Sequence, residues 1–146
     1  MGTLIVRRAR VRATALTATM EANCIDQVSE LARARAHVMD ELRRAADIAS
    51  SDFQAVQLIV TELLSNALRH GDGPARYAFE WEGNDAVLHV WDCGPEFGPP
   101  SELHSVPATG GWGLRIVRTL ARGLHVKRTA DGNHVRCILP ATRPRA

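Results

Sequence analysis

The strongest constraint on the fold is an amphipathic segment at residues 51–70. Its apolar residues recur at helical spacing and form a single stripe of Val56, Val60, Leu63 and Ala67. Ser51 and Gln54 match a capping box at its start, and the run Gly-Asp-Gly-Pro at 71–74 interrupts it at its end. The sequence therefore predicts a helix from about 51 to 70, whose apolar stripe packs on a second layer of structure.

A neighbouring arc of this predicted helix changes from apolar to polar along its length. The first part of the arc carries or borders Ala55, Leu58 and Ile59. At 100° per residue, four polar residues of the C-terminal half fall within about 100° of one another: Glu62, Asn66, Arg69 and His70. A merely solvated face is not expected to change in this way, so the arc favours a helix that borders a polar pocket. The alternative from spacing alone is an ordinary, partly exposed face that ends in polar residues.

The residues on either side of this helix predict two more helices and a set of strands. The helices are expected at about 25–48 and 110–122. The strands are expected at 76–82, 86–92, 124–129 and 134–139, in hairpins around turn signals at 83–85 and 131–133. Helices grouped on one face of a mainly antiparallel sheet fit this order better than alternating βαβ units. We therefore predict an α+β fold, a two-layer α/β sandwich with three helices on one face of the sheet.

Length and charge indicate one domain that is not built around nucleic acid. The chain has 146 residues, which suits a single domain that buries about 68–70% of its unfolded surface. Its 18 Lys and Arg nearly balance its 16 Asp and Glu, whereas nucleic-acid-binding proteins carry a clustered basic excess. We expect an N-terminal arm or strand at 1–20, one domain at 21–140 and a C-terminal tail at 141–146.

The cysteines and the hydropathy pattern favour a cytoplasmic protein. Cys24, Cys93 and Cys137 stand far apart and lack metal-binding spacing, which favours reduced thiols. Every apolar run is shorter than the roughly 20 residues that a membrane-spanning helix needs. We therefore predict a cytoplasmic protein without a membrane or direct nucleic-acid partner.

Two glycine-rich segments add chemistry beside the predicted helices and strands. Asp92 and Gly94 stand at the end of a predicted strand, where a carboxylate can point into a cavity and glycine permits close backbone approach. The segment 110–114, Gly-Gly-Trp-Gly-Leu, precedes the third predicted helix, whose first N–H groups and dipole can receive an anion such as phosphate. Each signal is weak by itself. Their order and spacing after the polar arc are much more specific.

Together the three motifs resemble a known superfamily of ATPases. Residues 62–70, Glu-Leu-Leu-Ser-Asn-Ala-Leu-Arg-His, resemble the N box of the superfamily that includes gyrase, histidine kinases and mismatch-repair ATPases, the GHKL superfamily. Asp92 and Gly94 resemble its first glycine box, and residues 111–114 resemble the second. The resemblance spans about residues 25–140 and implies a Bergerat-type ATP-binding fold. The small chain and the short lid at 93–109 are similar to the stand-alone anti-sigma factor serine-protein kinases and related actinobacterial ATP-binding regulators.

The resemblance implies roles for the polar arc. Glu62 is expected to be the catalytic residue, a general base that polarises the attacking hydroxyl. Asn66 is expected to ligate Mg²⁺, which takes oxygen ligands and usually rests on one or two protein groups plus phosphates. Arg69 occupies a position where related ATPases often place a basic residue on the phosphates, and His70 completes the cofactor-binding residues of this helix.

The resemblance also implies how ATP is held at the glycine boxes. Asp92 is expected to accept a hydrogen bond from the adenine amino group, which favours ATP over GTP. Gly94 lets the base approach the strand. The phosphates are expected at the start of the third helix, at Gly110, Gly111, Gly113 and Leu114. The predicted cofactors are thus ATP and Mg²⁺.

The lid departs from the pattern of the family. Glu96 stands where the first box usually has another glycine, and Trp112 separates the glycines of the second. Residues 93–114 contain neither Arg nor Lys, although phosphoryl transfer depends on positive charge at the transition state. That charge would come from Arg69, from Arg115 or from an arginine of a partner.

Two functions follow from the resemblance and its departures. The first is an anti-sigma-factor-type protein-serine kinase, which binds a sigma factor and phosphorylates a STAS-domain anti-anti-sigma partner. The second is a nucleotide-responsive, protein-binding regulator without kinase activity. A scaffold that binds no nucleotide is the third alternative, and the resemblance is compatible with a homodimer in each case.

Overall fold

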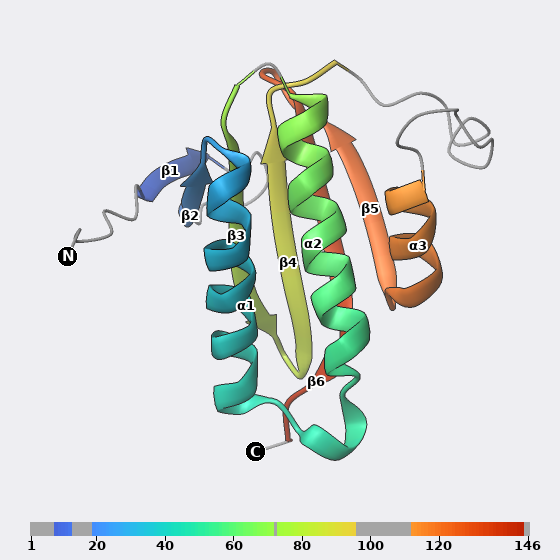
Figure 1. Ribbon diagram of the computed structural model, residues 1–146. Coiled ribbons are helices and arrows are strands. Elements are labelled where there is room, and N and C mark those ends of the chain that lie inside the picture. The colour runs from blue at the N-terminus through green and yellow to red at the C-terminus, as the bar shows by residue number, and fades with distance from the viewer. Residues whose placement is uncertain (1–7, 13–18, 72, 96–111, 145–146) are drawn as a thin grey trace.

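The computed structural model describes residues 8–12, 19–71, 73–95 and 112–144 (Figure 1). Within these residues, six strands form one antiparallel sheet in the order β1-β2-β3-β4-β6-β5. The strands are β1 (Arg8–Arg12), β2 (Thr19–Ile25), β3 (Ala75–Glu82), β4 (Asp85–Asp92), β5 (Gly123–Arg128) and β6 (Asn133–Thr142). The two predicted hairpins, β3–β4 and β5–β6, are present.

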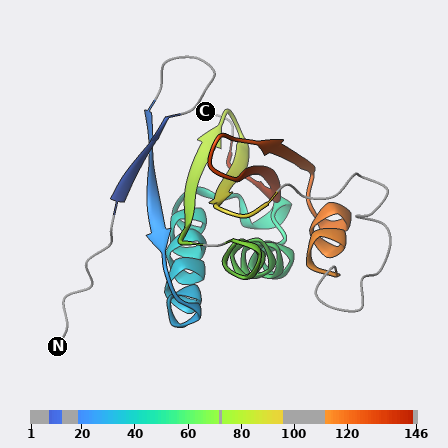
Figure 2. The ribbon, with the colours of Figure 1, turned by 90° about the horizontal axis from the view of Figure 1, so that it is seen from above.

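Three α-helices of the described chain lie together on one face of this sheet (Figures 1 and 2). They are α1 (Leu31–Ala45), α2 (Phe53–His70) and α3 (Trp112–Leu120). In Figure 1, α2 crosses the centre of the sheet between α1 and α3, and it contacts β3, β4 and β6. The arrangement confirms the predicted α+β, two-layer sandwich. Among the described helices, none is long and apolar enough to span a bilayer.

The hydrophobic core lies between α2 and the central strands. The predicted stripe is buried, because Val56, Val60 and Leu63 are almost without exposed surface. The stripe belongs to one cluster with the helix-facing residues of β4 and β6: Leu88, Val90, Val135, Cys137 and Leu139. Burial of each large aliphatic side chain contributes about 1.5–3 kcal/mol. The stripe therefore fixes α2 across the strands and sets which of its other residues face α3.

The first helix is shorter than predicted, because its expected start belongs to a strand. Ile25 ends β2, pairs with Ala75 and is fully buried, so the sheet takes this residue from the helix. Short 3-10 turns at Val28–Glu30 and Ile48–Ser50 flank α1. β2 begins at Thr19, so the predicted boundary between arm and domain at residue 20 falls inside a strand.

Two further details differ from prediction. Asp52 caps α2, since its Oδ1 accepts a hydrogen bond from the Ala55 amide at 3.0 Å. The predicted capping box at Ser51 is wrong, because the Ser51 hydroxyl oxygen accepts from the Thr142 amide at 3.2 Å and so joins the helix entrance to β6. β6 continues to Thr142 with Ala141 fully buried, so two residues of the predicted tail belong to the sheet.

Candidate functional site

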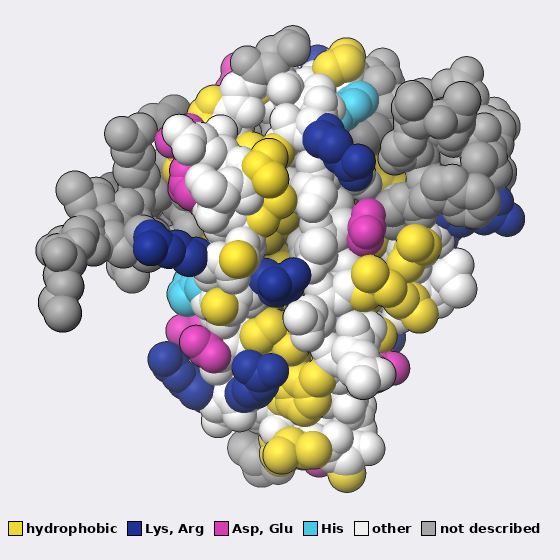
Figure 3. Space-filling model, viewed as in Figure 1, with side chains coloured by type: hydrophobic (Ala, Val, Ile, Leu, Met, Phe, Trp, Pro, Cys, Tyr) yellow, Lys and Arg dark blue, Asp and Glu magenta, His cyan; other side chains and the backbone are white. Residues whose placement is uncertain are grey.

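The polar arc of α2 lies on the side of the helix that faces α3. Figure 3 shows charged and histidine side chains gathered there, along the C-terminal half of α2. Glu62, Asn66 and His70 are partly buried, and Arg69 is exposed. Arg69 Nη2 donates a hydrogen bond to Asn66 Oδ1 at 3.0 Å. Within the described part of the chain Glu62 forms neither a hydrogen bond nor an ion pair, which leaves its carboxylate available to a ligand.

Asp92 ends β4 as a buried carboxylate at the same end of the molecule as the C-terminus of α2 (Figure 1). The Asp92 residue is only 6% exposed. Oδ1 accepts two hydrogen bonds at 2.9 Å, from the Gly94 amide and from Asn133 Nδ2. Oδ2 has no partner among the described residues, so one oxygen is held while the other can accept a hydrogen bond from a ligand.

Close backbone contacts on both sides require glycine beside this aspartate. A Cβ on Gly94 would lie 2.4 Å from the His70 carbonyl oxygen and 2.8 Å from His70 Cδ2. A Cβ on Gly132, in the β5–β6 turn, would lie 1.8 Å from the Asp92 carbonyl oxygen. Any larger residue would push these segments apart, since Cβ contacts under 3.0 Å essentially never occur. The strand end is thus clamped between the end of α2 and the β5–β6 turn.

Sequence reasoning missed two residues of this clamp. Asn133 is 1% exposed, and its Nδ2 donates to Pro95 O at 2.7 Å as well as to Asp92. Arg128, at the end of β5, donates from Nη1 to Gly94 O at 2.7 Å. The alternation of side chains along β6 could have identified Asn133. This residue pairs with Asp92 and lies on the same helix-facing side of β6 as the apolar Val135. An amide at such a position needs a buried polar partner.

The structure brings only some of the predicted site residues together. His70 joins the Asp92 clamp, because its Nε2 lies 2.8 Å from Pro95 O. Glu62 and Asn66 lie nearer the N-terminus of α2 than His70 does, and the eight helical steps from Glu62 to His70 span about 12 Å. Gly113 lies in the first turn of α3, and Leu114 packs against the core. Gly110 and Gly111 lie outside the described residues, as does Glu96.

A second group of polar side chains lies on the sheet face opposite the helices, where strand alternation places Glu80, Glu82, His89, His134 and Arg136. Burial raises the pKa of Glu80 to about 7, and its hydrogen bond with Glu82 adds to the increase. Burial lowers the pKa of His134 to about 4 and also lowers that of His89. Both histidines are therefore neutral at pH 7.

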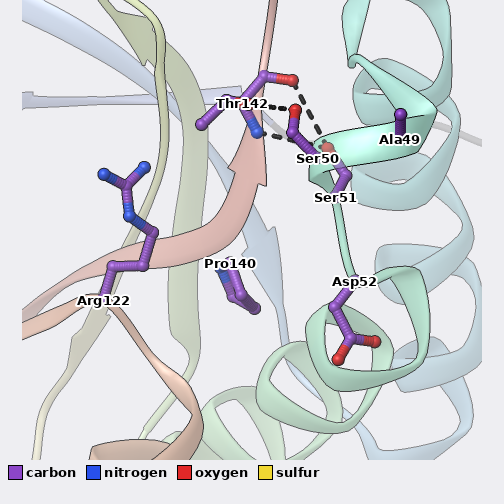
Figure 4. Close-up of a pocket in the computed structure, with 7 residues that line it drawn as sticks. All are labelled: Ala49, Ser50, Ser51, Asp52, Arg122, Pro140 and Thr142. Atoms are coloured by element: carbon purple, nitrogen blue, oxygen red, sulfur yellow. Dashed lines mark hydrogen bonds between the residues drawn. The ribbon is translucent and has the colours of Figure 1, made fainter.

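A pocket of about 400 Å³ lies at the other end of α2, at its N-terminus (Figure 4). Its polar groups mostly bind one another. The hydroxyls of Ser50 and Thr142 are 2.6 Å apart, and Asp52 caps the helix. Arg122 Nη1 donates to Asp85 Oδ1 at 2.7 Å. These polar groups connect β6 to the start of α2, so their interactions serve the fold. The candidate functional site is therefore the one around Asp92 and the polar arc of α2.

The described chain is thus an α+β sandwich in which an antiparallel sheet lies under three helices, with a buried carboxylate at the end of β4. A family model described as the histidine kinase-like ATPase domain matches residues 24–139. The chain therefore belongs to the histidine kinase-like ATPase domain family, as its motifs predict. The catalytic domain of histidine kinase ThkA has a similar fold, with a TM-score of 0.55 and 15% sequence identity over 86% of this chain and 100% of that chain. No curated protein sequence matches the chain.

Proposed function

We propose that this chain is an ATP-dependent protein-serine kinase of the anti-sigma type. It binds a sigma factor and phosphorylates a STAS-domain anti-anti-sigma protein, and it meets both in the cytoplasm, as a monomer or a homodimer. The kinase proposal rests on the position and availability of the Glu62 carboxylate. This carboxylate lies on the same arc as Asn66, one turn away, and has no partner in the described chain. A general base needs this combination of position and availability.

The adenine end of the proposed ATP site fits the groups present. Asp92 Oδ1 is fixed by two hydrogen bonds, whereas Oδ2 can accept one from the exocyclic amino group of adenine. Guanine presents a carbonyl oxygen at the corresponding position, which would face this carboxylate without a proton between them. Asp92 therefore favours ATP over GTP. The missing side chain of Gly94 leaves room for the backbone and ring of His70.

The phosphate end of the proposed site also fits a magnesium nucleotide. Asn66 Oδ1 is a neutral oxygen ligand of the kind that Mg²⁺ uses when phosphates supply most of the charge. Arg69 holds that oxygen with a guanidinium group, which is also a strong bidentate donor to phosphate. In the proposed complex Arg69 exchanges Asn66 for phosphate oxygens. Bound Mg²⁺ would neutralise phosphate charge, and Arg69 would add positive charge that the lid sequence lacks.

In the proposed reaction the serine hydroxyl of the partner attacks the γ-phosphorus of ATP. A bond forms between the serine oxygen and phosphorus, the bond from phosphorus to the β,γ-bridging oxygen breaks, and ADP leaves. Glu62 takes the proton of the hydroxyl. It later releases this proton to water, which returns the protein to its starting state. Arg69 stabilises the negative charge on the transferring group.

The kinase proposal is tested by incubating the chain with labelled ATP, Mg²⁺ and STAS-domain proteins encoded beside it. We expect the label on a serine of one STAS protein. Glu62→Gln should abolish labelling and leave ATP affinity within about twofold, since the amide keeps the size of the side chain but takes no proton. Gln57→Ala, at an exposed position of α2 outside the polar arc, is the matched control and should label normally. Undiminished labelling by the Glu62→Gln variant would overturn the proposed base.

The lid sequence favours a second function, a regulator that binds nucleotide and a partner protein without phosphoryl transfer. Residues 93–114 supply no Arg or Lys, and loss of an arginine at the transferring phosphate reduces phosphoryl transfer by about 10³–10⁵-fold. Under this alternative Asp92→Asn loses ATP and alters partner affinity, whereas Glu62→Ala changes neither. Absence of labelling with every neighbouring STAS protein, together with ATP-dependent partner binding, would establish the regulator and reject the kinase.

A further inference from the structure

Three potential metal ligands converge on the sheet face that no described helix covers. Glu80 and Glu82 lie two residues apart on β3, so both point to this face, and His89 reaches it from β4. Their ligand atoms all lie within 4.8 Å of one another, and His89 Nε2 is 3.1 Å from Glu80 Oε1. The His89 side chain is 7% exposed, whereas the Glu82 side chain is 40% exposed, so the cluster is anchored in the sheet and open at one side.

We propose that Glu80, Glu82 and His89 form a binding site for one divalent transition-metal ion, with Zn²⁺ as the expected occupant. One imidazole and two carboxylates form a nitrogen and oxygen ligand set that zinc accepts, and three protein ligands leave a fourth position for water. Ligand atoms around a tetrahedral zinc ion lie about 3.4 Å apart, given metal–ligand distances near 2.1 Å. The three side chains therefore need only small rotations to enclose an ion. The site is separate from the Mg²⁺ position proposed at Asn66 on α2 and does not depend on the proposed kinase activity.

The surroundings of His89 already orient it as a ligand. Its Nδ1 lies 2.9 Å from His134 Nε2, so hydrogen bonding at Nδ1 leaves Nε2 facing the carboxylates. Metal-binding histidines characteristically use the second ring nitrogen in this way. The rings of His89, Trp91 and His134 also stack, with interplanar angles of 7–16°. Because β4 is paired on both sides, by β3 and β6, the strand that carries His89 is fixed within the sheet.

Arg136 on β6 opposes the ion and provides a sharp test. It forms an ion pair with Glu82, so its guanidinium group occupies one carboxylate and reduces the negative charge of the cluster. Metal binding has to displace this contact. Replacing Arg136 with an uncharged residue should therefore tighten metal binding, whereas a cluster that serves only as a protein ion pair predicts no gain.

The test is a calorimetric titration of the full chain with zinc chloride, without nucleotide because ATP itself binds zinc. We expect one saturable site per chain, lost in Glu80→Gln and His89→Gln. Arg136→Gln should bind at least about threefold more tightly. His134→Gln, which removes the hydrogen-bond partner of His89, should bind about 10–100-fold more weakly. His125→Gln, an exposed histidine on β5, is the matched control and should bind like the wild type.

Thermal melts of each variant confirm that it is folded before titration. If His89→Gln does not fold, Glu80→Gln and Arg136→Gln decide the question. The proposal is overturned if the wild-type chain shows no saturable binding, if Glu80→Gln retains wild-type affinity, or if Arg136→Gln fails to gain affinity. None of these results bears on the kinase assay, which uses Mg²⁺ and a STAS partner.

Discussion

Replacement of Asn133 by alanine tests whether this buried amide holds the carboxylate of the candidate nucleotide site. Asn133 Nδ2 donates to Asp92 Oδ1 at 2.9 Å and to Pro95 O at 2.7 Å. A hydrogen bond to a charged group contributes about 1.5–3 kcal/mol and one to a neutral carbonyl about 1 kcal/mol. The Pro95 oxygen retains His70 as a partner. The free energy of unfolding should therefore fall by about 2–4 kcal/mol.

The same substitution should weaken ATP binding more than it disturbs the fold. Without Asn133, Asp92 Oδ1 keeps only the Gly94 amide and the carboxylate can rotate away from adenine. We expect ATP affinity to fall at least about tenfold, equivalent to about 1.4 kcal/mol. Urea denaturation measures the stability and calorimetry the affinity. Asp131→Ala, an exposed residue of the same turn, is the control. Stability within about 0.5 kcal/mol of the wild type, together with unchanged ATP affinity, would refute the role of Asn133.

Three further substitutions or conditions give measurable outcomes. Gly94→Ala should lower the melting temperature and ATP affinity, because its Cβ would meet the His70 carbonyl at 2.4 Å; Gly73→Ala, whose Cβ would meet Cys93 at 3.7 Å, should be nearly neutral. Arg69→Ala should slow phosphorylation of the STAS partner at least about tenfold while ATP binding falls less, in single-turnover assays. His134 should contribute an acid destabilisation between pH 6.5 and about 4, because burial lowers its pKa to about 4 and the unfolded chain then binds more protons. Glu80 acts oppositely, since its pKa of about 7 makes the folded state lose stability as pH rises from 4.5 to 7; urea titrations should therefore show a shallower acid loss in His134→Gln than in the wild type.

The sequence predicts α2 and its surroundings well, because long periodic segments carry their own signal. The stripe around Val60 repeats over several turns, and the break at 71–74 fixes the end of the helix. The β3–β4 and β5–β6 hairpins carry turn residues between alternating strands. The fold class follows from these elements together. The family motifs depend on the same segments, which is why the resemblance and the periodicity agree.

Other features depend on contacts that a local pattern does not carry. β2 has no strong alternation, and Ile25 joins it only through pairing with Ala75 and burial against the helices. Asn133 follows Asp-Gly in a good hairpin signal, so the turn alone accounts for an asparagine there. Its hydrogen bond to the distant Asp92 is therefore not apparent from the local sequence. The Glu80–His89 cluster likewise exists only across two strands. The catalytic and metal-binding roles of Glu62 and Asn66 stay predictions, since they concern groups that act on a ligand.

The most direct measurement is a calorimetric titration with ATP and Mg²⁺ of the wild-type chain and of Asp92→Asn, with GTP as the competing nucleotide. We expect one ATP site per chain in the wild type, little or no binding of GTP, and loss of ATP binding in the variant. Asp92→Asn keeps the shape of the side chain but replaces one carboxylate oxygen with a donor that opposes the adenine amino group. ATP binding that survives this substitution unchanged, or equal affinity for ATP and GTP, would contradict the claim that the buried carboxylate at the end of β4 reads the nucleotide.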